Sequence, residues 1–142
     1  EFIELETGYS VYGGESSAIG VSNAGYVAGF ESTALSSTVK SNLDEKCDGK
    51  SLPVAACVWE ETDGGSNYSV NAVVWQLDLA GNVINKTLYP LSFEPSDSQG
   101  EVFRSMATAV NDSGVAVGLG AVPITSDANS NIRFFPLTFK TA

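Results

Sequence analysis

One segment of the sequence occurs twice. Residues 105–119, SMATAVNDSGVAVGL, align without a gap with residues 16–30, SSAIGVSNAGYVAGF, at an offset of 89 positions. The identical pairs are Ser16/Ser105, Ala18/Ala107, Val21/Val110, Gly25/Gly114 and Gly29/Gly118. Because two copies of one segment are expected to adopt one local structure, this repeat constrains the fold before any residue chemistry is considered.

Each copy is predicted to form a β-hairpin. Two short apolar runs flank Asn-Ala-Gly in the first copy and Asp-Ser-Gly in the second. Asn and Asp bond to nearby backbone and tolerate left-handed geometry, and the following Gly supplies a positive φ. A glycine inside a strand marks a bulge or a close approach of two backbones, as would two tightly packed sheets. The predicted structural positions of the two turns are Asn23, Gly25, Gly29, Asp112, Gly114 and Gly118.

The rest of the chain also favours short strands. Strands are predicted over the apolar residues 54–59, over 68–77, over 82–88 and over 132–139, and residues 2–5 and 9–12 are β-prone. We expect residues 82–88 to pair with the strand that ends at Trp75, and Pro136 to restrict the last strand to an edge or a bulge. Residues 31–52 are predicted to be a long surface loop, and turns or loops are predicted over 60–67, 79–82, 89–100 and 123–131.

These patterns predict an all-β fold, because turn signals recur about every ten residues and no segment has helical periodicity. At 142 residues the chain is expected to be one domain, 1–142, with repeat copies near 16–88 and 105–140. A propeller blade has four strands, so about eight or nine strands give two blades and no closed ring. We therefore expect antiparallel sheets built from two related hairpins, arranged as a blade-like pair or a small sandwich, or a piece of a longer repeat protein.

The two cysteines, Cys47 and Cys57, are predicted to form a disulfide that stabilises the fold by roughly 3 kcal/mol on the chain-entropy model. The alternative is two buried free thiols. A disulfide would place the protein in an oxidising compartment, so we expect it to be secreted or periplasmic.

The charge and the residue types exclude several functions. The net charge is −10 and the seven basic residues are scattered, which argues against nucleic acid, and no apolar run is long enough for insertion into a membrane. The sequence has no histidine, which removes the usual catalytic triads and histidine-bound metals, so we expect no catalytic residue, metal or cofactor. The Asp127–Asn131 loop lacks the Gly and Glu of an EF-hand. The acidic groups at 44–48 and 60–63 are interpreted as solvated charge.

The segment V-N-D-S-G-V-A-V-G, residues 110–118, resembles the core of the extracellular HAF repeat, roughly A-x-x-I-N-x-x-G-x-V-V-G. That core is typically followed by an A-F-x-W strand and a glycine turn, which residues 72–75 and Gly81 match, and residues 133–137 are a further candidate with Phe for Trp. The resemblance implies bacterial secreted proteins of unknown function with propeller-like sheets. It implies no catalytic residue.

The sequence thus favours a non-enzymatic interaction module that acts through loops 31–53 and 89–104 and through exposed sheet edges. Its partner would be a protein or a glycan, and the edges also suit pairing between copies of the chain. A carbohydrate-binding or carbohydrate-active domain is the first alternative, with Trp59 and Trp75 as ligand-contact residues. A structural repeat of a larger surface protein is the second.

Overall fold

The computed structural model describes residues 12–35, 37–50, 53–62, 68–90, 104–123 and 132–140. These residues form seven strands and two helices. The strands are β1 (Ser16–Val21), β2 (Tyr26–Leu35), β3 (Tyr68–Leu77), β4 (Val83–Tyr89), β5 (Ser105–Val110), β6 (Ala116–Pro123) and β7 (Ile132–Phe139). The helices are α1 (Ser37–Cys47) and α2 (Val54–Glu61).

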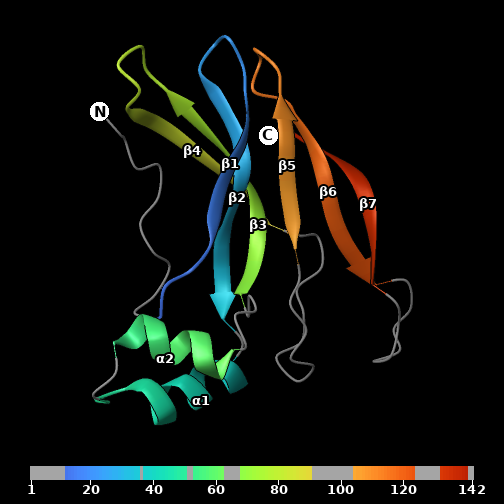
Figure 1. The fold of residues 1–142 in the computed structure, drawn as a ribbon. Coiled ribbons are helices and arrows are strands. Elements are labelled where there is room, and N and C mark those ends of the chain that lie inside the picture. The colour runs from blue at the N-terminus through green and yellow to red at the C-terminus, as the bar shows by residue number, and fades with distance from the viewer. Residues whose placement is uncertain are drawn as a thin grey trace.

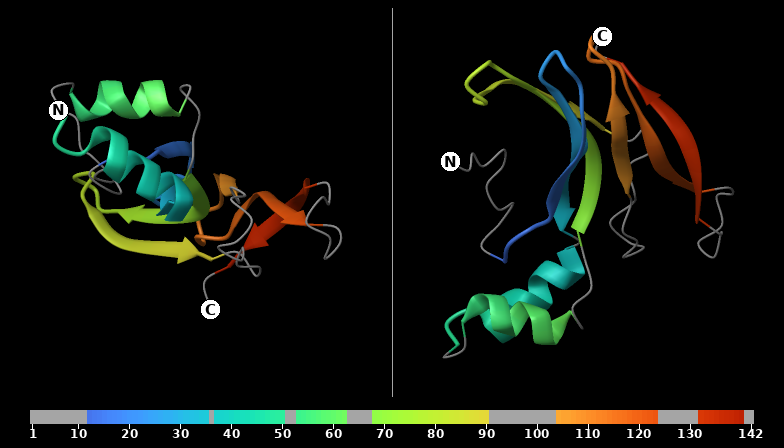
Figure 2. Two further views of the ribbon diagram at one scale, coloured as in Figure 1. Left: turned by 90° about the horizontal axis from the view of Figure 1, so that it is seen from below. Right: turned by 45° about the horizontal axis from the view of Figure 1, so that its top comes forward.

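The strands form two antiparallel sheets, each with its strands in sequence order, β1-β2-β3-β4 and β5-β6-β7. The sheets stand side by side with their two repeat hairpins turned toward the same end, and the helices lie at the opposite end (Figure 1). Two further views show the same separation of helices from sheets (Figure 2). Antiparallel sheets built from two related hairpins were predicted, and this part of the prediction is confirmed.

The two hairpins have the same backbone pairing. In each hairpin the register shifts once, so that one residue has no partner in the pairing, Ile19 in the first copy and Thr108 in the second. All the residue pairs of the first hairpin recur in the second hairpin 89 positions later. Opposite the shifts lie Gly29 and Gly118. A Cβ on Gly29 would lie 1.9 Å from a carbonyl oxygen of the paired strand, and one on Gly118 would lie 1.8 Å from the equivalent oxygen. Glycine is required at both positions because the bulged strand leaves no room for a side chain.

The core between the sheets is made of small residues. Ala28 and Ala72 from the first sheet and Ala107 and Ala116 from the second are each 0% exposed. The sheets therefore approach closely at these alanines, as the sequence suggested. Val74 and Phe139 complete this buried core, and four partly buried side chains pack against it, namely Tyr26, Tyr89, Val110 and Leu137.

Two segments were predicted wrongly. Residues 54–59, expected to be a strand, lie in helix α2, and the expected loop 31–52 contains the end of β2 and all of α1. A short continuous apolar run fits a strand or a buried helix equally well, and periodicity alone cannot distinguish them. Here the run forms a helix that buries one side chain, Cys57, in a small cluster outside the sheets.

The remaining strands lie where they were expected. β3 covers residues 68–77, and Trp75 pairs with Lys86 of β4 as predicted. β7 is an edge strand that tolerates Pro136 opposite Leu119. The register of the sheets makes Phe139 the counterpart of Trp75, so residues 136–139, not 133–137, correspond to 72–75. The β-prone residues 2–5 and 9–11, the loop 91–103 and the Asp127–Asn131 loop lie outside the described residues.

Candidate interaction site

The helical pair α1–α2 is the element that distinguishes the two repeat copies. It lies in the connection from β2 to β3, which runs over 32 residues (36–67). The corresponding connection of the second copy, from β6 to β7, has only eight residues (124–131), too few for two such helices. A long segment inserted between two paired strands costs little stability and commonly carries function.

A disulfide joins the two helices. Cys47, at the end of α1, is bonded to Cys57 in α2 with their Cα atoms 5.7 Å apart, which confirms the predicted pairing. Around it Leu43 is 2% and Tyr12 is 9% exposed, and these side chains form a small core separate from the sheets. Because this core is small, the disulfide is expected to supply much of the stability of the pair.

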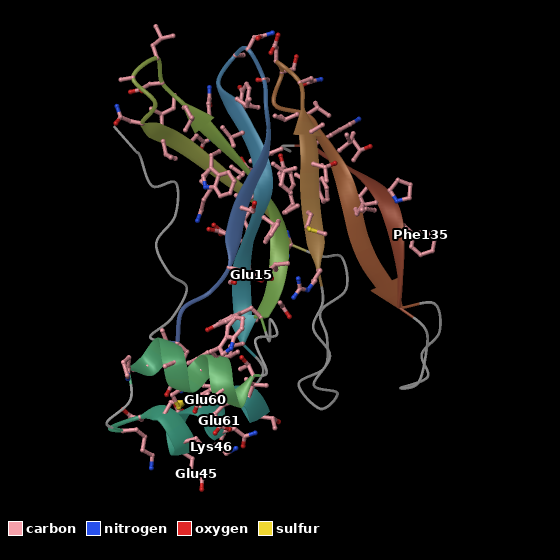
Figure 3. The ribbon with its side chains drawn as sticks, viewed as in Figure 1. Glu15, Glu45, Lys46, Glu60, Glu61 and Phe135 are labelled. Carbon is pink, nitrogen blue, oxygen red and sulfur yellow. A yellow bond between two sulfur atoms is a disulfide. The ribbon has the colours of Figure 1, made fainter. Side chains whose placement is uncertain are left out.

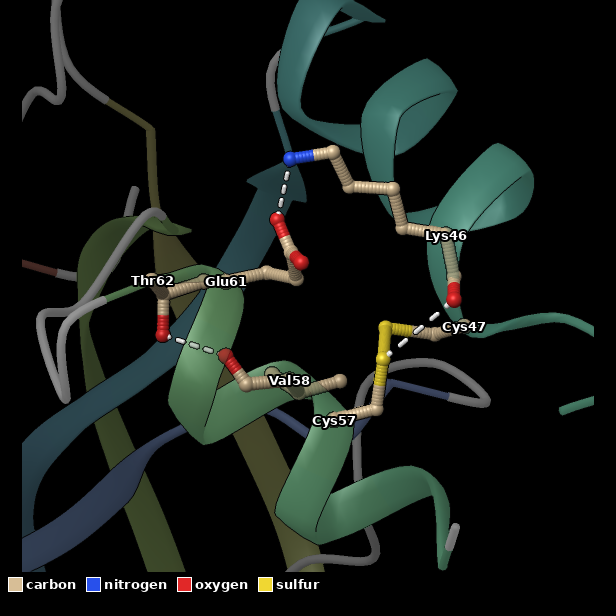
Figure 4. Close-up of polar contacts among 6 residues, drawn as sticks. All are labelled: Lys46, Cys47, Cys57, Val58, Glu61 and Thr62. Carbon is tan, nitrogen blue, oxygen red and sulfur yellow. Dashed lines mark hydrogen bonds and ion pairs between the residues drawn. A yellow bond between two sulfur atoms is a disulfide. The ribbon is translucent and has the colours of Figure 1, made fainter. Parts of the chain in front are cut away.

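Polar contacts complete the attachment of the helices (Figure 4). Lys46 of α1 forms an ion pair with Glu61 of α2, which raises the pKa of Lys46. Thr62 ends α2 by donating its hydroxyl to the Val58 carbonyl at 2.7 Å. The ion pair ties the last turn of α2 to α1, and the Thr62 hydrogen bond closes that turn.

Asp44 connects α1 to the segment that precedes β1. It accepts a hydrogen bond from the Tyr12 hydroxyl and pairs with Lys40 at 2.6 Å. Both contacts hold the pKa of Asp44 below its ordinary value, and the bond to Asp44 raises the pKa of Tyr12 to about 12. The charged carboxylate and the neutral phenol are thus the forms that the fold favours.

The two candidate ligand-contact tryptophans have opposite environments. Trp59, on α2, is 69% exposed and adjoins Glu60 and Glu61, which lie on the helical pair near Glu45 and Lys46 in Figure 3. Trp75 is 1% exposed, so its prediction as a surface contact is wrong. Its ring packs over Gly29 of the neighbouring strand, where it serves the sheet.

Four of the six predicted turn residues lie in the turns, where the two copies meet, whereas Gly29 and Gly118 lie in strands β2 and β6. Gly25 has φ of 82° and Gly114 of 78°, in the left-handed region that both turns require. The Asp112 carboxylate accepts a hydrogen bond from the Ala24 N–H of the other turn at 3.2 Å. Asn23 is exposed at the tip of the first turn. Contact between the turns was not predicted, because the sequence of a repeat does not show which faces of its copies pack together.

The residue before each turn was overlooked in the sequence. The Asn111 side-chain oxygen accepts hydrogen bonds from the Ser113 and Val115 N–H groups, both at 3.0 Å. In the first copy Ser22 occupies this position, and its hydroxyl accepts only the Tyr26 N–H, at 3.2 Å. The signal was available in the sequence, since Asn and Ser before a turn commonly bond to the backbone two to four residues on.

The described part of the chain contains neither a metal-ligating cluster nor a membrane-spanning helix. There, no three His, Cys, Asp or Glu side chains gather into a group that could hold a metal ion. The described helices, of 11 and 8 residues, are too short to cross a bilayer. Asp63, counted with the acidic residues of the 60–63 group, lies outside the described residues.

Comparison with known proteins gives one match. Residues 4–141 match a protein family whose description is "Protein of unknown function (DUF3466)". No curated protein and no solved structure matches the chain significantly.

Proposed function

This chain belongs to the DUF3466 family of proteins of unknown function, and from that premise we propose that it is a secreted or periplasmic, non-enzymatic module that binds a partner through the α1–α2 pair. The observation that carries the proposal is Trp59, a tryptophan 69% exposed on a helix that a disulfide fixes in place. Tryptophan is among the residues that contribute most to the free energy of binding at protein interfaces.

The disulfide supports both parts of the proposal. It cross-links the helix that carries Trp59 to α1, so less conformational entropy would be lost when a partner binds. Disulfides also persist in oxidising compartments, which is the basis for the proposed location. The net charge of −10 favours a partner that is not itself strongly acidic.

Site-specific photo-crosslinking tests this function. A benzophenone amino acid replaces Trp59, and a second variant carries it at Leu79, which is fully exposed on the β3–β4 turn at the other end of the molecule. Exposed to the proteins and glycans of its native compartment, the first variant should give a discrete adduct that the second does not. Equal adducts at both positions, or turnover in a hydrolase panel without any adduct at 59, would reject the proposal.

Carbohydrate binding is a second candidate, favoured by the exposed Trp59 and by Glu60, which follows it on α2 and is also exposed. An exposed indole stacks on sugar rings, and acidic side chains accept hydrogen bonds from their hydroxyls. Acrylamide should quench the fluorescence of Trp59 but not that of the buried Trp75. A glycan that protects the quenchable fraction in the wild type, but has no effect on Trp59→Ala, would identify this function.

A further inference from the structure

The outer face of the three-stranded sheet is an exposed apolar surface. Val117 is 48% and Leu119 is 39% exposed, and both lie on β6, the central strand. In the register of the sheet Val117 pairs with Thr138 and Leu119 with Pro136, and these two partners are also exposed. We call these four side chains the outer face of the second sheet. No described helix or strand covers it (Figure 2).

Three of the four counterparts of these side chains in the first sheet are buried, and the fourth, Phe30 in place of Leu119, is half-buried. Val117 corresponds to Ala28, which lies 89 positions earlier in the repeat. Thr138, the partner of Val117 on β7, corresponds to Val74, the partner of Ala28 on β3, and by the same registers Pro136 corresponds to Ala72. These three residues of the first sheet are 0–5% exposed. They are buried because the second sheet packs on them.

The two sheets contact each other through different faces. The second sheet uses Ala116 and Phe139, whose counterparts in the first sheet are Val27 and Trp75. Val27 and Trp75 lie on the opposite face of the first sheet, in a cluster of their own. The contact is therefore head-to-tail, and such a contact leaves one face ready for the next unit.

A second copy of this chain cannot supply that unit by the same packing. In a second copy the matching face of the first sheet is already covered, since Val27 is 6%, Val73 0% and Trp75 1% exposed. The matching face of its second sheet is occupied by its own first sheet. By this packing, the occupant would be a sheet other than the two that the described residues form.

We infer that the outer face of the second sheet binds a third antiparallel sheet of the same repeat, which presents a face of small residues like that of Ala107, Ala116 and Gly118. The surface is separate from the α1–α2 pair, so the inference does not depend on the function proposed above. It extends to the next unit a packing that the first two units already show.

A periodic extension of the chain tests the inference. Phe139 corresponds to Trp75, so Lys140 corresponds to Gln76. The extended chain therefore consists of residues 1–140 followed directly by a second copy of residues 77–142, which continues the repeat in register. This addition brings a β4-like strand, the connection and another three-stranded sheet. Leu119→Cys in the first set then introduces the only free thiol, since both native cysteines are in the disulfide. The rate at which this introduced thiol reacts with a thiol reagent is measured in the extended and in the original chain.

The introduced thiol should react at least tenfold more slowly in the extended chain. An Ile84→Cys control, 60% exposed on the outer strand of the first sheet in the native chain, should react equally fast in both chains. Adding Val117→Lys on the outer face should restore the reactivity of the Leu119→Cys thiol in the extended chain. Unchanged reactivity of that thiol on extension would overturn the inference. Its concentration-dependent protection in the original chain, with a dimer in light scattering, would instead identify a second copy as the occupant.

Discussion

The two turns differ at three positions, and the difference between Ser22 and Asn111 bears on how the copies are linked. Asn111 satisfies two backbone N–H groups of its own turn, whereas the shorter Ser22 reaches one. The first turn therefore has a spare N–H at Ala24, the counterpart of Ser113. Asp112 of the other copy accepts it. The difference between Ser22 and Asn111 is therefore accompanied by a hydrogen bond between the two copies, from the Ala24 N–H to Asp112.

This coupling predicts a non-additive pair of substitutions. Asp112→Ala should destabilise the wild type by about 0.5 kcal/mol, because the exposed Ala24 N–H loses its charged acceptor. In a Ser22→Asn background the same change should cost nothing, since the introduced asparagine would accept the Ala24 N–H as Asn111 accepts that of Ser113. Urea unfolding of the four proteins of the cycle measures the coupling. Equal costs in both backgrounds would mean that Asp112 does not bind this group.

Replacement of Gly114 tests the geometry of the second turn, where φ is 78°. Gly114→Val should lower the free energy of unfolding by at least ~1 kcal/mol, because a β-branched residue resists positive φ. The added side chain would also meet the Tyr26 ring, 3.0 Å from the position of the Cβ. Thermal unfolding measures the loss, and Gly114→Asn, which tolerates this φ, is the matched control. An unchanged melting temperature for the Val variant would contradict the turn geometry.

At the scale of elements, the α1–α2 pair is an addition to a sheet scaffold. Its small core of Leu43, Tyr12 and the two cysteines does not belong to the cluster between the sheets. We therefore expect the pair to unfold locally while the sheets stay intact, as segments with few buried contacts do. Because the pair is separate from the core between the sheets, the two copies differ in this connection while their hairpins keep the same register.

Loss of the disulfide should unfold the helices selectively. Replacing Cys47 and Cys57 together by Ser removes a cross-link worth roughly 3 kcal/mol for a loop of this length. We expect the helical circular dichroism to fall while Trp75 stays inaccessible to acrylamide, since its sheet is untouched. Persistence of the helical signal would show that the small core suffices, and quenching of Trp75 would show that the sheets depend on the helices.

The contact of Tyr12 with Asp44 predicts a change at alkaline pH. The folded-state pKa of Tyr12, about 12, lies above the ordinary value of 10.0, so its contribution is complete below pH 10 and is lost as the pH rises through 12. The raised pKa of Lys46 acts in the same direction. The tyrosinate absorbance of the wild type minus that of Tyr12→Phe should have its midpoint near pH 12. A midpoint near the ordinary value would argue that the hydrogen bond is absent in solution.

At the scale of the whole molecule, close approach of the sheets depends on alanines and glycines. One pair of large side chains also packs in this contact, the Tyr89 and Phe139 rings, with centroids 5.3 Å apart. Small residues bring the two backbones near, and the Thr108 carbonyl would lie 2.8 Å from a Cβ on Gly20. The sheets therefore act as one packed unit, although the covalent link between β4 and β5 is long.

A larger residue between the sheets should be costly. Ala116→Leu should lower the free energy of unfolding by about 1–3 kcal/mol, because the fully buried position has no space for three more carbons. Val117→Leu, on the adjacent exposed position, is the control and should change stability by less than about 0.5 kcal/mol. Urea unfolding measures both. Similar effects of the two substitutions would contradict the assignment of inner and outer faces.

The sequence by itself determined the local structures of the sheets. The repeat located both hairpins, their glycines and the direction of the strands, because turn chemistry and alternation act between near neighbours. It also paired the cysteines correctly. The resemblance to HAF repeats, the location and the absence of enzymatic activity stay predictions.

Tertiary structure decided what depends on distant residues. The run 54–59 became a helix because a disulfide and a small core outside the sheets could bury Cys57 alone. Trp59 and Trp75 look alike in sequence, yet one is exposed and the other buried, since exposure depends on what packs against each residue. Likewise, which face of each hairpin meets the other copy is set by packing over the whole sheet, and no local pattern contains that information.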